Sequence, residues 1–395
     1  MRIGIDGSNL RSGGLITHAA ELLRHGDPLR HGITRVTLWG SAELLRRVSP
    51  RPWLDLVHVA MLDGPLPGRV AWQVFMRSRL ARAACDVLFS PGATPPGTFR
   101  PYVAMSANML PFDPRETGRY RWTRGWLRAL LLHPQQAHAF READAVIFLT
   151  EFARTTIGAR ARIPATTRTA VIPSGVSPRF LGTPHVSRPL SSYSAEEPFR
   201  FLYVSDIHPY KHQWNVVEAV SRLRHEGLPV ALDLIGDPVH PASSKHLRHT
   251  LAQHRGETFI RIFDQFPHED LPPIYRDAAA FVFASTCENL PMTLVEAMAS
   301  GLPVASSDTR PMPDILGEAG TYFDAESASS IEAALRRLVL DAEGRAAAAR
   351  RGFEEASKYS WERNADDTFA LLADVARTRL QERGATHRQS TTVHR

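Results

Sequence analysis

The run Ala279-Ala-Phe-Val-Phe-Ala-Ser285 is typical of a buried strand; after Thr-Cys it continues as Glu288-Asn-Leu-Pro-Met292 and Thr293-Leu-Val-Glu296. We expect a strand that ends at Ser285, a loop that holds Glu288 to Met292, and a helix from about Thr293. The first N–H groups of such a helix have no partner within it, and they lie at its positive dipole end. This arrangement suits a diphosphate. Because Glu296 lies about one turn into the helix, the two carboxylates are placed for different hydroxyls of one extended ligand.

Short apolar runs of the same kind alternate with amphipathic stretches along the chain. This alternation predicts an α/β fold with parallel sheets covered by helices on both faces. Two of the runs, 144–150 and 279–285, end in a hydroxyl residue at the sheet edge where parallel sheets bind ligands. The expected strands are 2–6, 35–39, 56–60, 86–90, 102–106, 145–150 and 170–173 in the first half, and 200–205, 231–236, 259–263, 280–285 and 303–306 in the second.

The length of 395 residues favours two domains of ordinary size. A stretch rich in Ser and Pro without apolar periodicity, 182–198, is the best candidate for a linker. The predicted division is an N-terminal Rossmann-like domain over 1–185, a linker over 186–198, a C-terminal Rossmann-like domain over 199–360, a helix over 361–382 and a disordered tail over 383–395.

The composition is globular, with 43% apolar and 22% charged residues. The net charge is +6, but 44 of the 47 basic residues are arginine, a skew that coding bias also produces. The sequence has no zinc-finger spacing, no aromatic RNA-binding consensus and no continuous basic arm, so we expect no nucleic-acid partner. Two cysteines and the lack of a long apolar run favour the cytoplasm.

An anionic membrane surface is a further candidate partner, because of residues 118–132. On one helix, Arg121, Arg124 and Arg128 would lie on one side and Trp122 and Trp126 on another, which is typical of a helix in the membrane surface. This predicts a location at the inner face of the cell membrane. The alternative is an ordinary domain helix with its tryptophans in the core.

The spacing of Glu288 and Glu296, with seven residues between them and Ala-Met-Ala-Ser-Gly-Leu-Pro-Val after them, resembles the signature of glycosyltransferase family 4. The resemblance implies the GT-B architecture, in which two Rossmann-like parallel-sheet domains face each other across a cleft. It also implies that Glu288 orients the donor sugar, that Glu296 binds the ribose, and that the backbone of Asn289, Leu290, Pro291 and Met292 holds sugar and phosphate. The alternative is that both glutamates are helix caps.

Lys211 follows a strand and a loop, 201–212, and is expected to reach a phosphate as a point charge. The family often has Gly-Arg-Leu where this chain has Ser205-Asp-Ile, and that Arg pairs with the diphosphate. Here the arginine is missing, so Lys211 acts alone or with His208, His212 or Arg310. The alternative is a surface lysine at a helix start.

Gly13 and Gly14 link the first strand to the first helix and allow a close approach of backbone to ligand. The family places a glycine pair there against the donor phosphate or the acceptor, although an ordinary tight turn has the same sequence. Asn108 stands where many members have a His whose backbone carbonyl lies near the anomeric carbon. In those members an Asp accompanies the His, and Asp113 is interpreted either as that residue or as a turn residue before Pro114.

The resemblance implies a retaining hexosyltransferase that acts without a metal or another cofactor. The donor would be GDP-mannose or a UDP- or TDP-sugar, and the acceptor a growing polysaccharide or a polyprenyl-linked glycan. Two rival functions stay open on the same architecture. One is a sugar-nucleotide epimerase or hydrolase, and the other is an inactive sugar-nucleotide-binding subunit, which the missing arginine keeps in view.

Overall fold

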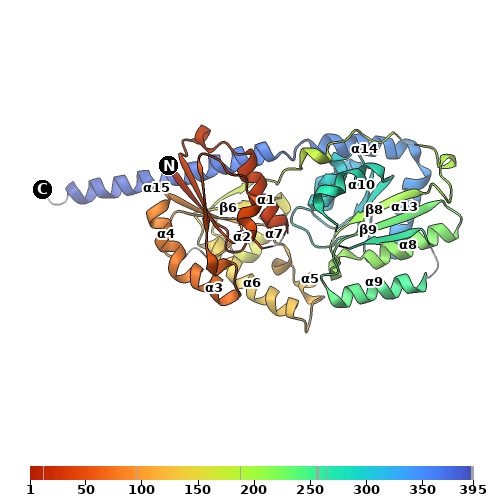
Figure 1. Ribbon diagram of the computed structural model, residues 1–395, viewed down its shortest axis with the longest axis horizontal. Coiled ribbons are helices and arrows are strands. Elements are labelled where there is room, and N and C mark those ends of the chain that lie inside the picture. The colour runs from red at the N-terminus through yellow and green to blue at the C-terminus, as the bar shows by residue number, and fades with distance from the viewer. Residues whose placement is uncertain (12, 96, 187, 255–257, 265, 393–395) are drawn as a thin grey trace. The chain divides into compact units, whose positions relative to one another are not determined.

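The computed structural model describes residues 1–392 except 12, 96, 187, 255–257 and 265 (Figure 1). The chain divides into two compact units. Unit 1 consists of Met1–Phe112, Leu127–Gly175 and Trp361–Arg395, and unit 2 of Asp113–Trp126 and Val176–Ser360.

Unit 1 is built on a seven-stranded sheet with the order β3-β2-β1-β4-β5-β6-β7, in which all pairs are parallel. Its central strands are continuous apolar runs because both faces of the sheet are covered. The strands are β1 (Arg2–Asp6), β2 (Arg35–Gly40), β3 (Leu54–His58), β4 (Val87–Ser90), β5 (Tyr102–Ser106), β6 (Ala145–Phe148) and β7 (Arg168–Val171).

Unit 2 is built on a six-stranded parallel sheet with the order β10-β9-β8-β11-β12-β13. The sequence pattern missed only β13 among these strands, because it is short and mostly half-buried. The strands are β8 (Phe199–Val204), β9 (Val230–Ile235), β10 (Ile260–Phe263), β11 (Ala280–Phe283), β12 (Val304–Ser307) and β13 (Gly320–Phe323). The predicted fold class, α/β with two parallel-sheet domains, is confirmed.

The helices lie between the strands in both units. In unit 1 they are α1 (Gly13–His25), α2 (Ala42–Arg47), α3 (Leu66–Ala71), α4 (Arg77–Ala84), α7 (Glu151–Ala161) and α15 (Trp361–Thr392), with a π-helical turn η3 (Trp72–Met76) between α3 and α4. In unit 2 they are α5 (Pro114–Gly118), α8 (Gln213–His225), α9 (Pro241–Gln253), α10 (Leu271–Asp277), α11 (Met292–Ala299), α12 (Met312–Leu316), α13 (Ala328–Leu340) and α14 (Ala342–Ala356). The helix α6 (Arg124–Arg141) begins in the segment of unit 2 and continues into unit 1.

The chain passes from unit 1 to unit 2 between Gly175 and Val176, about ten residues before the predicted linker. The reason is hydrogen bonding of the backbone. The N–H of Gly182 donates to the carbonyl of Ala299 at 3.0 Å, and the N–H of His185 donates to that of Gly301 at 2.9 Å. These bonds attach 176–185 to the end of α11, an attachment that composition does not reveal.

The segment Asp113–Trp126 belongs to unit 2 although its neighbours on both sides belong to unit 1. The predicted single helix over 118–132 is wrong: α5 ends at Gly118, turns follow, and α6 begins at Arg124. The chain bends here to bury Tyr120, and Trp122 takes a left-handed backbone conformation with φ of 65° and stays 85% exposed. The tryptophan therefore lies neither on the predicted helix nor in the core.

The helix α15 packs on α1 and β4 of unit 1. It continues to Thr392, past the predicted end at 382. Residues 393–395 of the predicted tail lie outside the described residues. No helix within the described part of the chain is long and apolar enough to span a bilayer.

Candidate nucleotide-sugar site

The candidate site of unit 2 lies where β8 and β11 end. These two strands are neighbours and run parallel, with Phe201 opposite Ala280 and Leu202 opposite Phe281. The loop after β8 and the loop after β11 therefore leave the same edge of the sheet. The N–H of Thr286 donates to the carbonyl of Tyr210 at 2.9 Å and ties the two loops together.

An ion pair joins the two loops through their side chains. Nζ of Lys211 lies 2.5 Å from Oε1 of Glu288, and the hydroxyl of Ser285 donates to the same oxygen at 2.5 Å. Both charged side chains are largely buried, with 11% and 14% of their surfaces exposed. The structure thus brings together two residues that the sequence assigned separately to phosphate and sugar.

Lys211 is held in place from several sides. Its ammonium lies 5.0 Å from the ring centre of Phe283 and 5.4 Å from that of Tyr210, within the range of cation–π attraction. Its carbonyl accepts a hydrogen bond from the hydroxyl of Tyr203 at 2.6 Å. These contacts argue against the alternative of a freely solvated surface lysine.

The helix α11 starts directly after the Glu288 loop, with Pro291 as its N-cap residue. The N–H groups of Leu294 and Val295 donate to the carbonyl of Pro291, whereas those of Met292 and Thr293 begin the helix, where no intrahelical acceptor exists. Asn289, Leu290 and Pro291 are buried, and Met292 is half-buried. The predicted donor-binding loop is therefore a compact turn in front of a helix start.

Glu296 is buried within the second turn of α11. Its Oε1 lies 2.8 Å from Nε2 of His268, and its Oε2 accepts a hydrogen bond from the hydroxyl of Tyr275 at 3.4 Å. The ring of Phe180 lies 5.3 Å from both of those rings. Glu296 is therefore not an N-terminal cap of α11, which removes that alternative for this residue.

The residues considered as substitutes for the missing arginine differ in accessibility. His212 is buried and its Nε2 lies 3.2 Å from the hydroxyl of Thr286, while Arg310 is exposed and pairs with Asp314. His208 is half-buried, and its Nδ1 lies 3.0 Å from the hydroxyl of Tyr120.

His208 is electrically neutral at physiological pH. Burial, followed by the nearby charges of Lys211 and His240, lowers its pKa to about 4. Its ring is also stacked on that of Tyr210, with 5.2 Å between the centres. His208 is thus an oriented, neutral imidazole beside Lys211. Asp206, at the place of the family arginine, accepts a hydrogen bond from the N–H of Asp237 at 3.2 Å.

The remaining predicted residues are divided between the units. Ser205 follows β8 in unit 2, and its hydroxyl donates to the carbonyl of Asp206. Gly13 and Gly14 begin α1 in unit 1, where an added Cβ would meet no atom within 4 Å, so neither glycine is required sterically. Asn108 also belongs to unit 1; it is exposed, and its Oδ1 accepts from the N–H of Leu110.

No motif in the sequence marked Tyr120 or His268, which contact His208 and Glu296 in the structure. Tyr120 belongs to the segment Asp113–Trp126, which is held on unit 2 by ion pairs of Arg115 and Arg119 with Glu326. No local pattern marks these residues, because each meets its partner only after folding. Asp113 accepts from the N–H groups of the first turn of α5, which confirms it as a turn residue.

Charge and burial restrict the chemistry of the site. Burial raises the pKa of Cys287 well above its usual range, with further contributions from Asp113 and Glu288, so its thiol is not a nucleophile at neutral pH. Among the described residues, no group of three His, Cys, Asp or Glu side chains is arranged to hold a metal ion. The arrangement presents a cation, a carboxylate and main-chain donors to an anionic ligand with hydroxyl groups.

Comparison with known proteins relates part of the chain to glycosyltransferases. Residues 191–355 match the family described as glycosyl transferases group 1. O-antigen chain mannosyltransferase B of Escherichia coli is 35% identical over 106 residues, which cover 27% of this chain and 28% of that protein. D-inositol 3-phosphate glycosyltransferase of Corynebacterium glutamicum is 28% identical over 178 residues, or 44% of this chain and 43% of that protein. The chain thus matches less than half the length of each relative.

Among solved structures, HepE of Anabaena in complex with UDP-glucose superimposes with a TM-score of 0.69 at 16% identity. The alignment covers 94% of this chain and 100% of HepE. At this identity the likeness establishes the fold, which is GT-B. Together, the match over residues 191–355 and the GT-B fold support a glycosyltransferase.

Proposed function

We propose that this protein is a retaining hexosyltransferase of glycosyltransferase family 4. It moves a hexose from a nucleoside diphosphate sugar to a growing polysaccharide or a lipid-linked glycan. The observation that carries the proposal is the ion pair of Lys211 and Glu288 in front of the start of α11. A cation and free helix N–H groups favour a diphosphate, and an adjacent carboxylate favours sugar hydroxyls.

Donor binding would exchange partners within this pair. The diphosphate replaces Glu288 as the anion beside Lys211, and Glu288 then accepts hydrogen bonds from the hexose. The main-chain N–H groups of Asn289, Leu290 and Met292 would donate to the phosphate and sugar, and Glu296 would accept from the ribose hydroxyls in place of His268. Gly13 and Gly14 would allow the backbone of unit 1 to approach the donor.

The chemical step would break the bond between the anomeric carbon and the diphosphate oxygen. Lys211 and the loop N–H groups stabilise the negative charge that develops on the leaving group. The backbone carbonyl of Asn108 would stabilise the positive charge on the sugar ring. The acceptor hydroxyl attacks from the face that the diphosphate leaves, and its proton passes to the departing phosphate oxygen, so the configuration is retained.

The relatives suggest which substrates to test first. The mannosyltransferase of Escherichia coli points to GDP-mannose, and the UDP-glucose bound to HepE points to a UDP-sugar; TDP-sugars complete the panel. A polyprenyl-linked acceptor would place the enzyme in the cytoplasm at the inner face of the cell membrane, with the anionic membrane surface as a partner. Arginines such as Arg124 and Arg128 of α6 fit this location.

One observation keeps a second function in view. Asp206 stands where the family arginine would pair with the diphosphate, and the absence of that arginine favours an inactive, sugar-nucleotide-binding subunit. An epimerase or hydrolase would need a general base beside the sugar. The sequence does not single out such a base.

The test is an assay with each nucleotide sugar, with and without a polyprenyl-linked glycan acceptor. A new glycoside of retained anomeric configuration supports the proposal. The proposal fails if the whole panel gives only free sugar, an epimer, or binding without turnover. These results would indicate a hydrolase, an epimerase and an inactive binding subunit, respectively. Thermal shift identifies the donor, since a ligand at 100 times its Kd stabilises by about 2.7 kcal/mol.

A further inference from the structure

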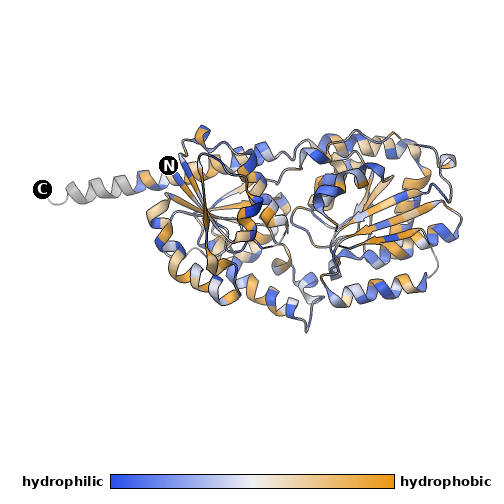
Figure 2. Cartoon of the chain, viewed as in Figure 1, coloured by the Kyte–Doolittle hydropathy of each residue, from blue (hydrophilic) through white to orange (hydrophobic). Residues whose placement is uncertain are grey.

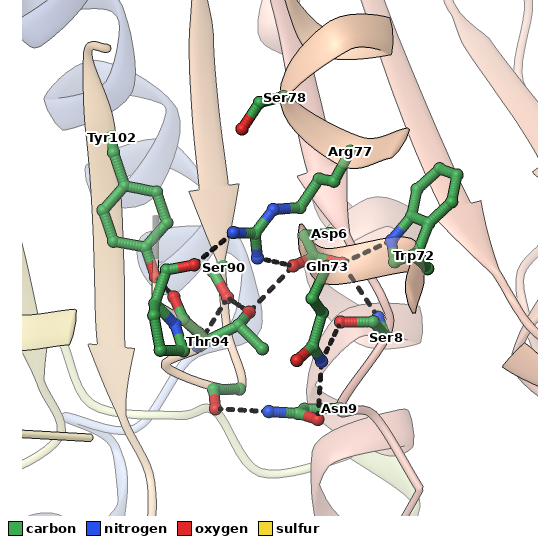
Figure 3. Close-up of polar contacts among 12 residues, drawn as sticks. Asp6, Ser8, Asn9, Trp72, Gln73, Arg77, Ser78, Ser90, Thr94 and Tyr102 are labelled. Carbon is green, nitrogen blue, oxygen red and sulfur yellow. Dashed lines mark hydrogen bonds and ion pairs between the residues drawn. The ribbon is translucent and has the colours of Figure 1, made fainter. Parts of the chain in front are cut away.

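In the segment of α3, η3 and α4 in unit 1, the polar side chains of Trp72, Gln73 and Arg77 point inward, whereas Arg79 and Arg82 are exposed. Nη1 of Arg77 lies 2.7 Å from Oδ2 of Asp6, and both side chains are fully buried. Figure 3 shows Arg77, Trp72 and Gln73 directed at the end of β1, where the indole N–H of Trp72 donates to Asp6 at 3.5 Å and Gln73 donates to Ser8 at 2.9 Å. The segment is therefore anchored through polar groups.

This anchoring determines which side of the segment faces outward. Burial opposes the charge of Asp6, but Arg77 and hydrogen bonds from Thr94 and Ser8 outweigh it and lower the pKa of Asp6. Rotating the segment would leave a buried carboxylate unpaired, which is strongly unfavourable. In η3 the N–H of Arg77 bonds to the carbonyl of Trp72, five residues earlier, so both side chains reach the same side.

The outward side of the segment carries several large apolar side chains. Phe75 is 74% exposed and Val74 is 60% exposed. Figure 2 shows hydrophobic residues along α3 and α4. The large apolar side chains that the segment exposes are Leu66, Val70, Val74, Phe75, Met76 and Leu80. Six large exposed apolar side chains within fifteen residues are unusual on the surface of a soluble domain and indicate an interaction site.

The helix α6 extends this surface. It exposes Leu127, Leu130 and Leu131, and Arg128 lies among them in the sequence. Burial and the positive charges of Arg11 and Arg128 together lower the pKa of Arg69. Arg11, which precedes α1, Arg69 of α3 and Arg128 of α6 therefore lie near one another. The exposed apolar residues of the segment and of α6, with Arg69, Arg79 and Arg128, are called the apolar–basic surface below.

The charge of this surface selects its partner. No Asp or Glu occurs from 64 to 85 or from 127 to 141, whereas exposed arginines such as Arg79 and Arg128 occur in both stretches. A second copy of the chain would bring the same positive charge and be repelled. An anionic bilayer offers both acyl chains for the apolar row and phosphates for the arginines.

We propose that the apolar–basic surface docks unit 1 on an anionic lipid bilayer, with Val74 and Phe75 at the acyl boundary and the arginines among the headgroups. This docking surface refines the membrane location proposed above. The choice of a lipid bilayer as the partner rests on that proposal. It moves the contact from the predicted 118–132 helix to a surface centred on η3. It does not depend on sugar transfer.

Co-sedimentation of the full chain with lipid vesicles tests the proposal. We expect binding to mixed phosphatidylglycerol–phosphatidylcholine vesicles and weaker binding to phosphatidylcholine alone. The double change Val74→Ser with Phe75→Ser should weaken binding to the mixed vesicles at least about fivefold. Arg79→Glu with Arg128→Glu should do the same, since each basic residue near such a surface contributes about fivefold in affinity.

Matched controls alter unit 2 in the same chemical way. Val186→Ser with Leu340→Ser removes two exposed apolar side chains, and Arg248→Glu with Arg350→Glu reverses two exposed charges. Both should bind vesicles as the wild type does. Thermal melting monitors folding, and all changed residues are exposed, so melting temperatures should stay close to that of the wild type.

Several results would overturn the proposal. These are a wild type that ignores anionic vesicles, variants of the apolar–basic surface that bind as well as the controls, or a wild-type dimer that the Val74 and Phe75 changes dissociate without altering vesicle binding. Calorimetry with nucleotide sugars tests the proposed function independently of vesicle binding. Vesicle binding through this surface without nucleotide-sugar binding would support the docking and refute the transferase.

Discussion

Nζ of Lys211 lies 2.5 Å from Oε1 of Glu288, although 77 positions separate the two residues in the sequence. The pair joins the loop after β8 to the loop after β11, at the same edge of the unit 2 sheet. Because both side chains are largely buried, each compensates the charge of the other. A donor that inserts its diphosphate must therefore take over Lys211, and this relationship underlies the first prediction.

Removing either partner should abolish most turnover. We expect Lys211→Ala and Glu288→Gln each to reduce kcat/KM by roughly 10²–10³, because a preorganised electrostatic contact to the reacting group is lost. Lys245→Ala at an exposed position of α9 and Glu218→Gln at a half-buried position of α8 are the matched controls. Steady-state kinetics with the identified donor provides the measurement. Activity within threefold of the wild type in both site variants would defeat the assignment.

Glu296 is expected to contribute to nucleotide affinity rather than to the chemical step. The ribose does not react, so Glu296→Ala should raise KM more than it lowers kcat. Binding of the free nucleoside diphosphate should weaken by roughly 1–3 kcal/mol in calorimetry. His268→Ala removes the contact at 2.8 Å without removing the carboxylate, so it should leave affinity unchanged or improve it. If His268→Ala weakens binding as much as Glu296→Ala does, the pair is structural.

Tyr120 is predicted to act as a positioning residue for His208. Tyr120→Phe removes the hydroxyl that lies 3.0 Å from Nδ1 while keeping the ring. We expect the donor KM to rise by a factor corresponding to about 0.5–1.5 kcal/mol, with little change in melting temperature. In a double-mutant cycle the effect should vanish when His208→Gln is already present. An undiminished effect in that background would show that Tyr120 acts elsewhere. Tyr193→Phe is the control.

Acid should destabilise the protein over a defined pH interval. Burial lowers the pKa of His18 to about 4 from a usual value of 6.5, and the pKa of His212 also falls to about 4. In the unfolded chain these two histidines bind protons below about pH 6.5, whereas in the folded chain they do so only near pH 4. The free energy of unfolding therefore decreases as the pH falls through this interval.

His18→Gln isolates one contribution to this pH dependence. The His18 ring lies within unit 1, with Nδ1 3.0 Å from the hydroxyl of Ser174 and the ring edge against Trp361. Glutamine does not titrate, so the melting temperature of the variant should drop less between pH 7.5 and pH 5 than that of the wild type. An equal drop in both proteins would mean that His18 does not carry the effect.

Local sequence was sufficient for most of the secondary structure. The strands Arg2–Asp6 and Tyr102–Ser106 occur with the predicted bounds. A parallel strand that is buried on both faces must be a short continuous apolar run, and such a run is visible without any knowledge of the fold. The same holds for the strand, loop and helix around Glu288, where each signal lies within a few residues of the next.

Tertiary structure alone decided the partners of the site residues and the orientation of the surface. Lys211 meets Glu288 because β8 and β11 pair in the sheet, and Tyr120 meets His208 because Asp113–Trp126 packs on unit 2. Composition suggested that Trp122 and Trp126 mark a membrane helix, yet burial of Tyr120 bends the chain there. The buried ion pair of Asp6 and Arg77 instead fixes one side of the segment inward, because breaking it would leave a buried charge unpaired, and Val74 and Phe75 of η3 lie on the exposed side.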